Sequence, residues 1–352
     1  MRLSARAFLP LVVAAIIVIA DLASQRAEAT FPGKNGKIAF VYFSPYLSTM
    51  NPNGTGHTRL IGDNGFPLEG SGPTWSPDGT RLAISCSHPV GGPPSLCTTD
   101  AEGKGKTFID GDFSGPGGPT WSPDGTRLAY QDRGGLRADG AFSCCAVWAI
   151  DIDGTDQKML SFYGRDPAWS PDGKKIAFWG GAAPSRFHTE DLYVMDADGS
   201  NVTQLTDTAI GHEAEPNWSP DSKKIVYSGS RVDTQAIPFE IWVINADGTG
   251  RERLTDSTFP FSTTVPVWSP DGKRIAFHGE GGINVMNADG SDRKALTLAN
   301  RDLDWQPIPG PRRSDYKNAA HFCKAESEFW GEDFAERYGG GPNAFGKCVS
   351  GN

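Results

Sequence analysis

The sequence contains no long hydrophobic run beyond its first thirty residues. The single apolar run, Phe8 to Ala20, is shorter than the roughly 20 residues that a membrane-spanning helix needs. Arg2 and Arg6 precede this run, and an A-x-A segment ends at Ala29. A basic start, a short apolar core and small residues at the end are typical of a secretory signal peptide. We therefore predict a signal peptide over residues 1–29, with an uncleaved membrane anchor as the alternative.

A cluster of basic residues is also missing. The chain has 33 Lys and Arg against 42 Asp and Glu, which gives a formal net charge of −9. Surfaces that bind nucleic acid or anionic membranes carry basic patches, so neither is an expected partner. Once the signal peptide is removed, we expect a monomer that does not span a membrane.

Common catalytic and metal-binding motifs are absent as well. None of the six cysteines has the C-x-x-C spacing of a zinc or redox site, and no G-x-S-x-G motif marks a hydrolase nucleophile. Helical periodicity is almost absent before residue 314, whereas glycine and proline are frequent. This composition indicates an all-β protein with many turns, and we expect no cofactor.

A repeated motif dominates the rest of the chain. It occurs as WSPDG at 75–79, 121–125, 169–173 and 268–272, and as WSPDS at 218–222. A degenerate last copy contains Asp304 and Trp305. We expect the six repeat tryptophans to pack between structural repeats; they are Trp75, Trp121, Trp169, Trp218, Trp268 and Trp305.

Each repeat predicts four short strands. Ser-Pro-Asp-Gly suits a tight turn, because proline presets φ and glycine tolerates a positive φ. Ser222 replaces this glycine in the fifth copy, where the positive φ is expected to cost a little stability. Apolar runs follow every copy, Asp-Gly pairs mark further hairpins, and a short run ends the repeat in Leu-Thr. Four strands in a repeat of this length make one β-propeller blade.

The two ends of the repeat region predict the number of blades. Residues 36–43 form a strand that lacks the usual preceding strand, and residues 302–306 form a strand that lacks a following one. We expect these two strands to pair and close the ring. The predicted fold is therefore a six-bladed β-propeller over residues 30–307.

These repeats resemble those of TolB-like, WD-repeat-like propellers, and the resemblance covers residues 36–307. TolB itself has an α/β domain before its propeller, whereas here the propeller follows the predicted signal peptide directly. The resemblance implies the propeller architecture and a binding role in the bacterial periplasm or outside the cell. It does not imply the Tol–Pal function.

A tail follows the propeller. Residues 308–314 are a Pro-rich linker, and residues 315–352 have the character of a small helical module like those on various secreted bacterial proteins. Such a module is too small to be secure without a disulfide, so Cys323 and Cys348 are expected to pair. Cys86 and Cys97 lie on neighbouring predicted strands and are expected to form a second disulfide. Cys144 and Cys145 are left as a vicinal pair or as thiols.

The connections opposite the repeat turns vary most between blades, which makes that face the expected binding surface. We predict a non-catalytic binding or scaffold protein of the cell envelope that recognises a protein or a glycan there. Aromatic residues, arginine and charged residues of these connections are the candidate ligand-binding residues: Arg165, Trp179, Arg186, His188, His212, Glu213 and Phe259.

A metal-dependent lyase or hydrolase acting in the propeller funnel is the alternative function. Histidines fall in or beside the same connections, namely His88, His188, His212 and His278. Distant propeller relatives include lyases that hold a metal through histidines in the funnel, but no fixed histidine spacing is present here, so we expect no metal. Asp151, Asp153 and Asp156 are spaced like the start of a calcium loop, but a hairpin turn is the favoured interpretation.

Overall fold

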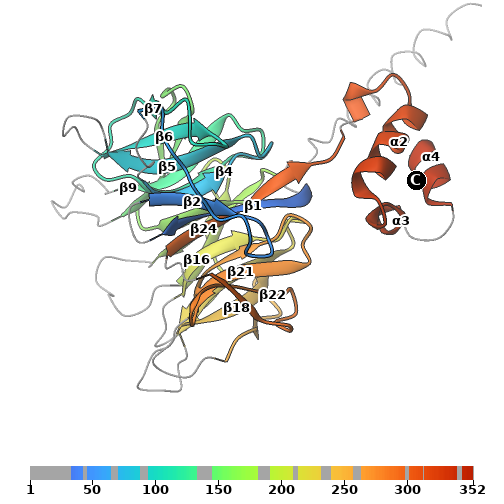
Figure 1. Cartoon of the computed structure of the whole chain (residues 1–352). Coiled ribbons are helices and arrows are strands. Elements are labelled where there is room, and N and C mark those ends of the chain that lie inside the picture. The colour runs from blue at the N-terminus through green and yellow to red at the C-terminus, as the bar shows by residue number, and fades with distance from the viewer. Residues whose placement is uncertain are drawn as a thin grey trace, which may run out of the picture.

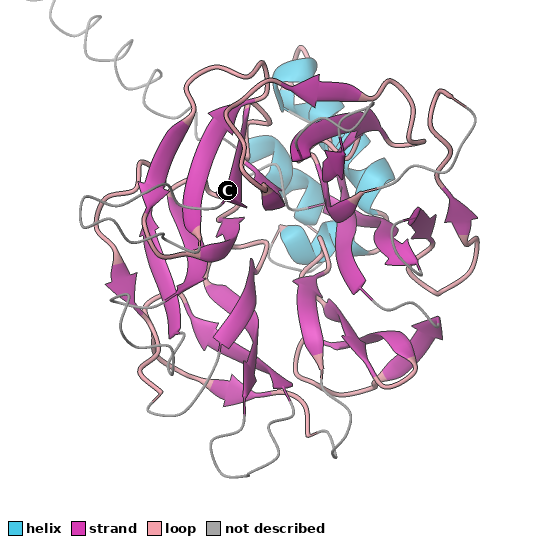
Figure 2. Ribbon diagram, turned by 90° about the vertical axis from the view of Figure 1, so that its left-hand side faces the viewer, coloured by secondary structure: helices cyan, strands magenta, loops and turns pink. Residues whose placement is uncertain are grey.

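The computed structural model describes residues 33–42, 46–64, 70–87, 94–132, 145–180, 191–208, 213–230, 239–256, 263–297, 301–311, 313–338 and 343–351. Six four-stranded antiparallel sheets form a ring, and three short α-helices follow at the C-terminal end. The ring is seen from the side in Figure 1 and from the face turned away from the helices in Figure 2. The prediction of a six-bladed propeller is confirmed.

The blades are numbered along the chain, and the strands of each run outward from the propeller axis. Blade 1 contains β24 (Arg301–Pro309), β1 (Gly33–Tyr42), β2 (Tyr46–Met50) and β3 (Thr58–Arg59). Blade 2 contains β4 (Ser71–Trp75), β5 (Arg81–Ser87), β6 (Pro94–Asp100) and β7 (Thr107–Ile109). Blade 3 contains β8 (Gly117–Trp121), β9 (Arg127–Asp132), β10 (Ala146–Asp151) and β11 (Lys158–Ser161).

The remaining blades repeat this order. Blade 4 contains β12 (Arg165–Trp169), β13 (Lys175–Gly180), β14 (Asp191–Asp196) and β15 (Thr203–Gln204). Blade 5 contains β16 (Glu213–Trp218), β17 (Lys224–Ser230), β18 (Phe239–Asn245) and β19 (Glu252–Arg253). Blade 6 contains β20 (Thr264–Trp268), β21 (Arg274–Gly279), β22 (Gly282–Asn287) and β23 (Lys294–Thr297).

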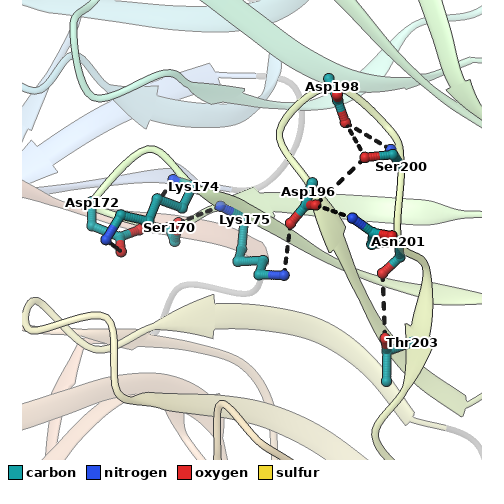
Figure 3. A network of polar contacts seen from close by, with 9 residues as sticks. All are labelled: Ser170, Asp172, Lys174, Lys175, Asp196, Asp198, Ser200, Asn201 and Thr203. Atoms are coloured by element: carbon teal, nitrogen blue, oxygen red, sulfur yellow. Dashed lines mark hydrogen bonds and ion pairs between the residues drawn. The ribbon is translucent and has the colours of Figure 1, made fainter.

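Hydrogen bonds within the repeat motif explain why Ser-Pro-Asp-Gly recurs. In blade 4, Ser170 Oγ donates to Asp172 Oδ1 at 2.7 Å and accepts from Lys175 N at 2.9 Å (Figure 3). Asp198 fixes the second hairpin of the blade in the same way, since its Oδ1 accepts from the nitrogen and the hydroxyl of Ser200. Each turn therefore satisfies its own backbone donors locally, whatever the loops on the other face contain. We call the face that carries these turns the turn face.

Ser222 replaces the turn glycine in blade 5 and adopts a φ of 58°. This left-handed conformation is unfavourable for a residue with a Cβ atom. Its hydroxyl, however, accepts a hydrogen bond from Asp172 N in blade 4 at 3.0 Å. The expected cost is therefore offset by a contact between blades that glycine cannot make.

The Leu-Thr pairs close the outer edge of two blades. Thr206 Oγ1 accepts from Leu192 N at 2.9 Å and donates to the buried Asp191. In blade 5, Thr255 Oγ1 likewise accepts from Ile241 N at 2.9 Å and donates to a buried glutamate. The threonine thus holds the fourth strand of the blade against the third.

The hydrophobic core consists of six clusters, each formed between two neighbouring blades. The cluster that closes the ring joins Trp305, Ile38 and Phe40 of blade 1 to Val267 and Ile283 of blade 6. Trp305 is completely buried, with an exposed fraction of 0%. The repeat tryptophans therefore pack between blades, as expected, although Trp169 is only partly buried.

Ring closure depends on the pairing of the first strand with the last strand of the propeller. Ile38 lies opposite Trp305 in the antiparallel pair of β1 and β24. The two strands are longer than predicted, because pairing continues past an irregularity to Gly33 and Pro309. β24 therefore extends into the first residues of the expected linker.

The C-terminal helices form a separate small core. They are the 3₁₀ turn η2 (Arg313–Asp315), α2 (Ala319–Trp330), α3 (Asp333–Arg337) and α4 (Ala344–Ser350). Cys323 is disulfide-bonded to Cys348 within this core, beside Trp330 and Phe334. Glu326 is buried there and accepts hydrogen bonds from the indole of Trp330 and the hydroxyl of Tyr338. We call α2, α3 and α4 together the helical tail.

The second expected disulfide lies within blade 2. Cys86 on β5 is joined to Cys97 on β6, with Cα atoms 6.0 Å apart. Cys145 accepts a hydrogen bond at its Sγ from Arg165 Nε at 2.8 Å, whereas Cys144 lies outside the described residues. The predicted signal peptide also lies outside them, and within them no helix has the length and apolar character needed to cross a bilayer.

Candidate functional site: the axial cavity

A cavity of about 160 Å³ lies on the propeller axis, lined by the innermost strand of every blade. Its wall is made of six three-residue segments, which are residues 72–74, 118–120, 166–168, 215–217, 265–267 and 302–304. A narrower space of about 50 Å³ continues toward the turn face, where Trp75, Trp121, Trp169 and Trp218 line it. We call the wider space the axial cavity.

The first residue of each wall segment has a left-handed backbone. The residues and their φ values are Gly72 (58°), Gly118 (53°), Asp166 (42°), Glu215 (56°), Val265 (53°) and Asp302 (37°). The pairing of each innermost strand shifts register at or near this residue, so each strand carries a bulge. Glycine adopts this conformation at little cost, whereas the four other residues are strained.

Three of these strained residues are acidic, and their carboxylates bond to groups around the cavity. Asp302 Oδ2 accepts from Gly72 N at 3.1 Å, and Glu215 Oε2 accepts from Val265 N at 2.7 Å. Each of these two bonds joins one blade to the left-handed residue of the next. Asp166 Oδ2 instead accepts from Trp179 Nε1 within its own blade at 2.6 Å. We call Asp166, Glu215 and Asp302 the carboxylate ring.

A second layer of contacts between blades lies just beyond the ring. Asp304 Oδ2 accepts from Trp75 N at 2.7 Å, and Asn217 Oδ1 accepts from Trp268 N at 3.0 Å. Each acceptor lies one residue before a repeat tryptophan. It accepts from the backbone nitrogen of the repeat tryptophan in the following blade. The innermost strands are therefore joined through side chains around the axis.

The surroundings of the axial cavity favour the protonated form of its carboxyls. Burial, together with the negative charges of Asp166 and Asp302, raises the pKa of Glu215 to about 7. Burial also raises the pKa of Asp304 to about 6, and the pKa of Asp166 is raised by burial and by the charge of Asp302. The carboxyls that line the axial cavity are therefore coupled near neutral pH, because ionisation of one makes ionisation of its neighbours less favourable.

The raised pKa of Glu215 predicts a pH dependence of stability. A carboxyl that holds its proton more tightly in the folded state stabilises the fold most below its unfolded pKa of about 4.5. This contribution is lost as the pH rises from about 4.5 to about 7. We expect Glu215→Gln, which keeps an acceptor for Val265 N, to raise the unfolding free energy at pH 8 by about 1–3 kcal/mol.

Urea unfolding of both proteins at pH 4.5 and pH 8 measures this effect, and the exposed Glu252→Gln serves as control. The gain for Glu215→Gln should be absent at pH 4.5. Equal gains at both pH values would contradict the predicted protonation of Glu215.

The structure brings together two of the residues predicted to bind a ligand. Arg165 begins β12 and pairs with Trp179 on β13, and its guanidinium lies 5.0 Å from the centre of the indole ring. The same indole contacts Asp166, so both residues flank the carboxylate ring. They belong to strands, however, and not to irregular loops.

Glu213 does not have the expected surface position. It begins β16, its exposed fraction is 0%, and it pairs with Arg251 at 3.0 Å. Thr208 Oγ1 donates a further hydrogen bond to it, and burial raises the pKa of Glu213 to about 7. This side chain is enclosed and joins the connection that enters blade 5 to Arg251 of the same blade. The four other candidates, Arg186, His188, His212 and Phe259, lie outside the described residues.

Metal-binding groups are not found in the described part of the chain. No group of three or more His, Cys, Asp or Glu side chains there is placed to hold a metal ion. Asp153, in the segment spaced like a calcium loop, instead accepts hydrogen bonds from the nitrogen and hydroxyl of Thr155. That segment is a hairpin turn. Of the four funnel histidines, His278 lies on β21, and His88, His188 and His212 are outside the described residues.

Comparisons with known proteins agree with this architecture. Residues 143–312 match the family model described as TolB beta propeller domain. TolB from Acinetobacter baumannii is 20% identical with a TM-score of 0.61, covering 77% of this chain and 67% of that one. A putative TolB from Agrobacterium tumefaciens is 22% identical with a TM-score of 0.56, covering 74% and 88%.

A solved structure of another kind shares the fold at lower identity. A chain of the nidogen/laminin complex is 12% identical with a TM-score of 0.59, and the match covers 78% of this chain and 99% of that one. No curated protein matches the chain in sequence.

Proposed function

We propose that this chain, a six-bladed β-propeller of the TolB-like kind, is a non-catalytic binding protein that acts outside the cytoplasm. The match to the TolB propeller family model and to TolB structures supports a binding or scaffold role for this chain. Two disulfides support an oxidising location, because such bonds persist outside the cytoplasm. The partner is a protein segment that presents a basic side chain to the axial cavity.

The carboxylate ring is the observation that carries this proposal. Asp166, Glu215 and Asp302 have a left-handed backbone at the position where two other blades carry glycine, namely Gly72 and Gly118. Glycine adopts this conformation without strain. Backbone strain of this kind costs about 1–3 kcal/mol per residue and is concentrated at functional sites. Burial and mutual repulsion disfavour the ionised form of these carboxyls, and a lysine or arginine side chain would stabilise that form, whereas a neutral glycan would not.

Arg165 and Trp179 add a hydrophobic and cationic rim on one side of the ring. Arginine and tryptophan are enriched among residues that dominate binding energy. Arg165 begins the innermost strand β12 and Trp179 lies opposite it on β13, at the end of the blade away from the turn face, where the connections differ most between blades. The partner would therefore approach from that face.

Capture from a native envelope extract tests the proposal. The full mature chain is immobilised, and the recovered proteins are compared between wild type and Asp302→Asn. Asparagine tolerates a left-handed backbone and keeps an acceptor for Gly72 N, so the variant should remain folded. We expect recovery of the partner to fall about ten-fold, and release of the wild-type complex by salt.

Asp289→Asn, the same change in an exposed hairpin of the turn face, is the control and should retain the partner. Equal recovery by both variants would place the binding site elsewhere. Stoichiometric manganese or zinc in the purified protein would instead favour the metal-dependent lyase or hydrolase.

A further inference from the structure

We propose that a second cavity, between the turn face and the helical tail, binds a small organic anion that carries an aromatic ring. This cavity has a volume of about 560 Å³ and is separate from the axial cavity. Pro220, Trp268 and Pro270 of blades 5 and 6 line one side, and Trp330 of α2 and Arg337 of α3 line the other. We call it the tail cavity.

Two contacts hold the helical tail against the propeller around this space. Lys273 Nζ, beside the turn of blade 6, pairs with Asp333 Oδ1 at 2.8 Å. Lys34 Nζ, at the start of β1, lies 4.6 Å from the centre of the Phe329 ring. The helices accordingly lie beyond the ends of β1 and β24 in Figure 1 and behind the ring in Figure 2. The cavity exists only because both units contribute walls.

The size and walls of the tail cavity suit a small molecule. Ligand sites typically have volumes of about 300–1,000 Å³ and apolar walls with a few polar groups. The rings of Pro220 and Pro270 supply apolar surface against which an aromatic ring can pack. The axial cavity, at about 160 Å³, is too small for the same ligand.

The charges of the tail cavity favour an anion. Lys224, Lys273 and Arg337 line it together with Asp221, Asp271 and Asp333. The acids are already engaged: Asp221 and Asp271 accept hydrogen bonds from the serines of their own turns, and Asp333 pairs with Lys273.

Two of the cations are less engaged. Among the described residues, Lys224 has no ion-pair partner, and its side chain is exposed. The Arg337 guanidinium stacks 4.0 Å over the ring of Trp330 and reaches Glu326 only at 3.7 Å. An aromatic ring against the prolines would therefore place a carboxylate or sulfonate between Lys224 and Arg337.

The test uses 1-anilinonaphthalene-8-sulfonate, an aromatic anion that fluoresces when it leaves water. The full mature chain is titrated with this probe at neutral pH. We expect one saturable site, and about ten-fold weaker binding for Lys224→Glu and for Arg337→Glu, because each places a like charge beside the sulfonate. Lys223→Glu makes the same charge change on the neighbouring residue, which does not line the cavity, and should change the Kd less than two-fold.

A neutral probe, N-phenyl-1-naphthylamine, measures how much of the binding depends on the anion. We expect it to bind more weakly than the sulfonate and to be insensitive to Lys224→Glu. Thermal melting confirms that each variant is folded, so that a loss of binding is not a loss of structure. Equal sulfonate binding by wild type and both cavity variants, or equal affinity for the two probes, would overturn the proposal.

Discussion

Replacing Trp305 with alanine is expected to lower the free energy of unfolding by about 3–5 kcal/mol. Trp305 is completely buried in the cluster that joins blade 6 to blade 1, and it pairs with Ile38 across the strands that close the ring. The loss is a large part of the ~5–15 kcal/mol that stabilises a typical domain. Chemical unfolding of the mature chain measures it.

Phe162→Ala is the matched control, because this aromatic ring is 55% exposed. Its effect should stay within about 0.5 kcal/mol. Truncation after residue 300 should destabilise the chain more than Trp305→Ala does, since it also removes every partner of β1 on the axial side. A truncated chain that melted like the full mature chain would contradict closure by β24.

Removal of the Cys323–Cys348 disulfide is expected to unfold the helical tail while leaving the propeller folded. The tail buries only a few side chains, among them Trp330 and Phe334, which is too small a core to be stable without a cross-link. For a sequence separation of 25 residues, loss of the bond should cost about 3–4 kcal/mol. We expect Cys323→Ala with Cys348→Ala to lose the helical circular dichroism signal and to become sensitive to protease.

The equivalent double substitution at Cys86 and Cys97 provides the control. These residues lie on β5 and β6, which are paired along their whole length, so blade 2 should keep its strands and the tail its helices. An unchanged helical signal after loss of the tail disulfide would show that packing alone holds the module.

The architecture could be predicted because its determinants are local and repeated. The side chains of Ser170 and Asp172 bond to each other and to backbone nitrogens of the same turn, so each WSPDG copy specifies its turn through local contacts. Closure was predictable because 36–43 and 302–306 are complementary incomplete pieces of one blade. The extension of that pairing to Gly33 was not, because it follows an irregular stretch that no residue pattern marks.

The axial cavity could not be predicted in the same way. Its carboxylates lie three residues before repeat tryptophans, as Asp166 does before Trp169, and blades 2 and 3 carry glycine there. That pattern is visible in the sequence, but its meaning depends on a bulge that turns the residue toward the axis. The burial of Glu213 could not be predicted for a related reason, since this side chain pairs with Arg251, 38 residues further along the chain.

The order of β24 and the helical tail along the chain determines how the molecule would respond to force. The last strand of the ring leads, through Gly310 and Pro311, directly into η2 and α2. Tension transmitted along the backbone from the tail therefore reaches β24 before it reaches another strand of the propeller. β24 holds the ring closed through its pairing with β1, so a pull on the tail would first strain the hydrogen bonds between these two strands.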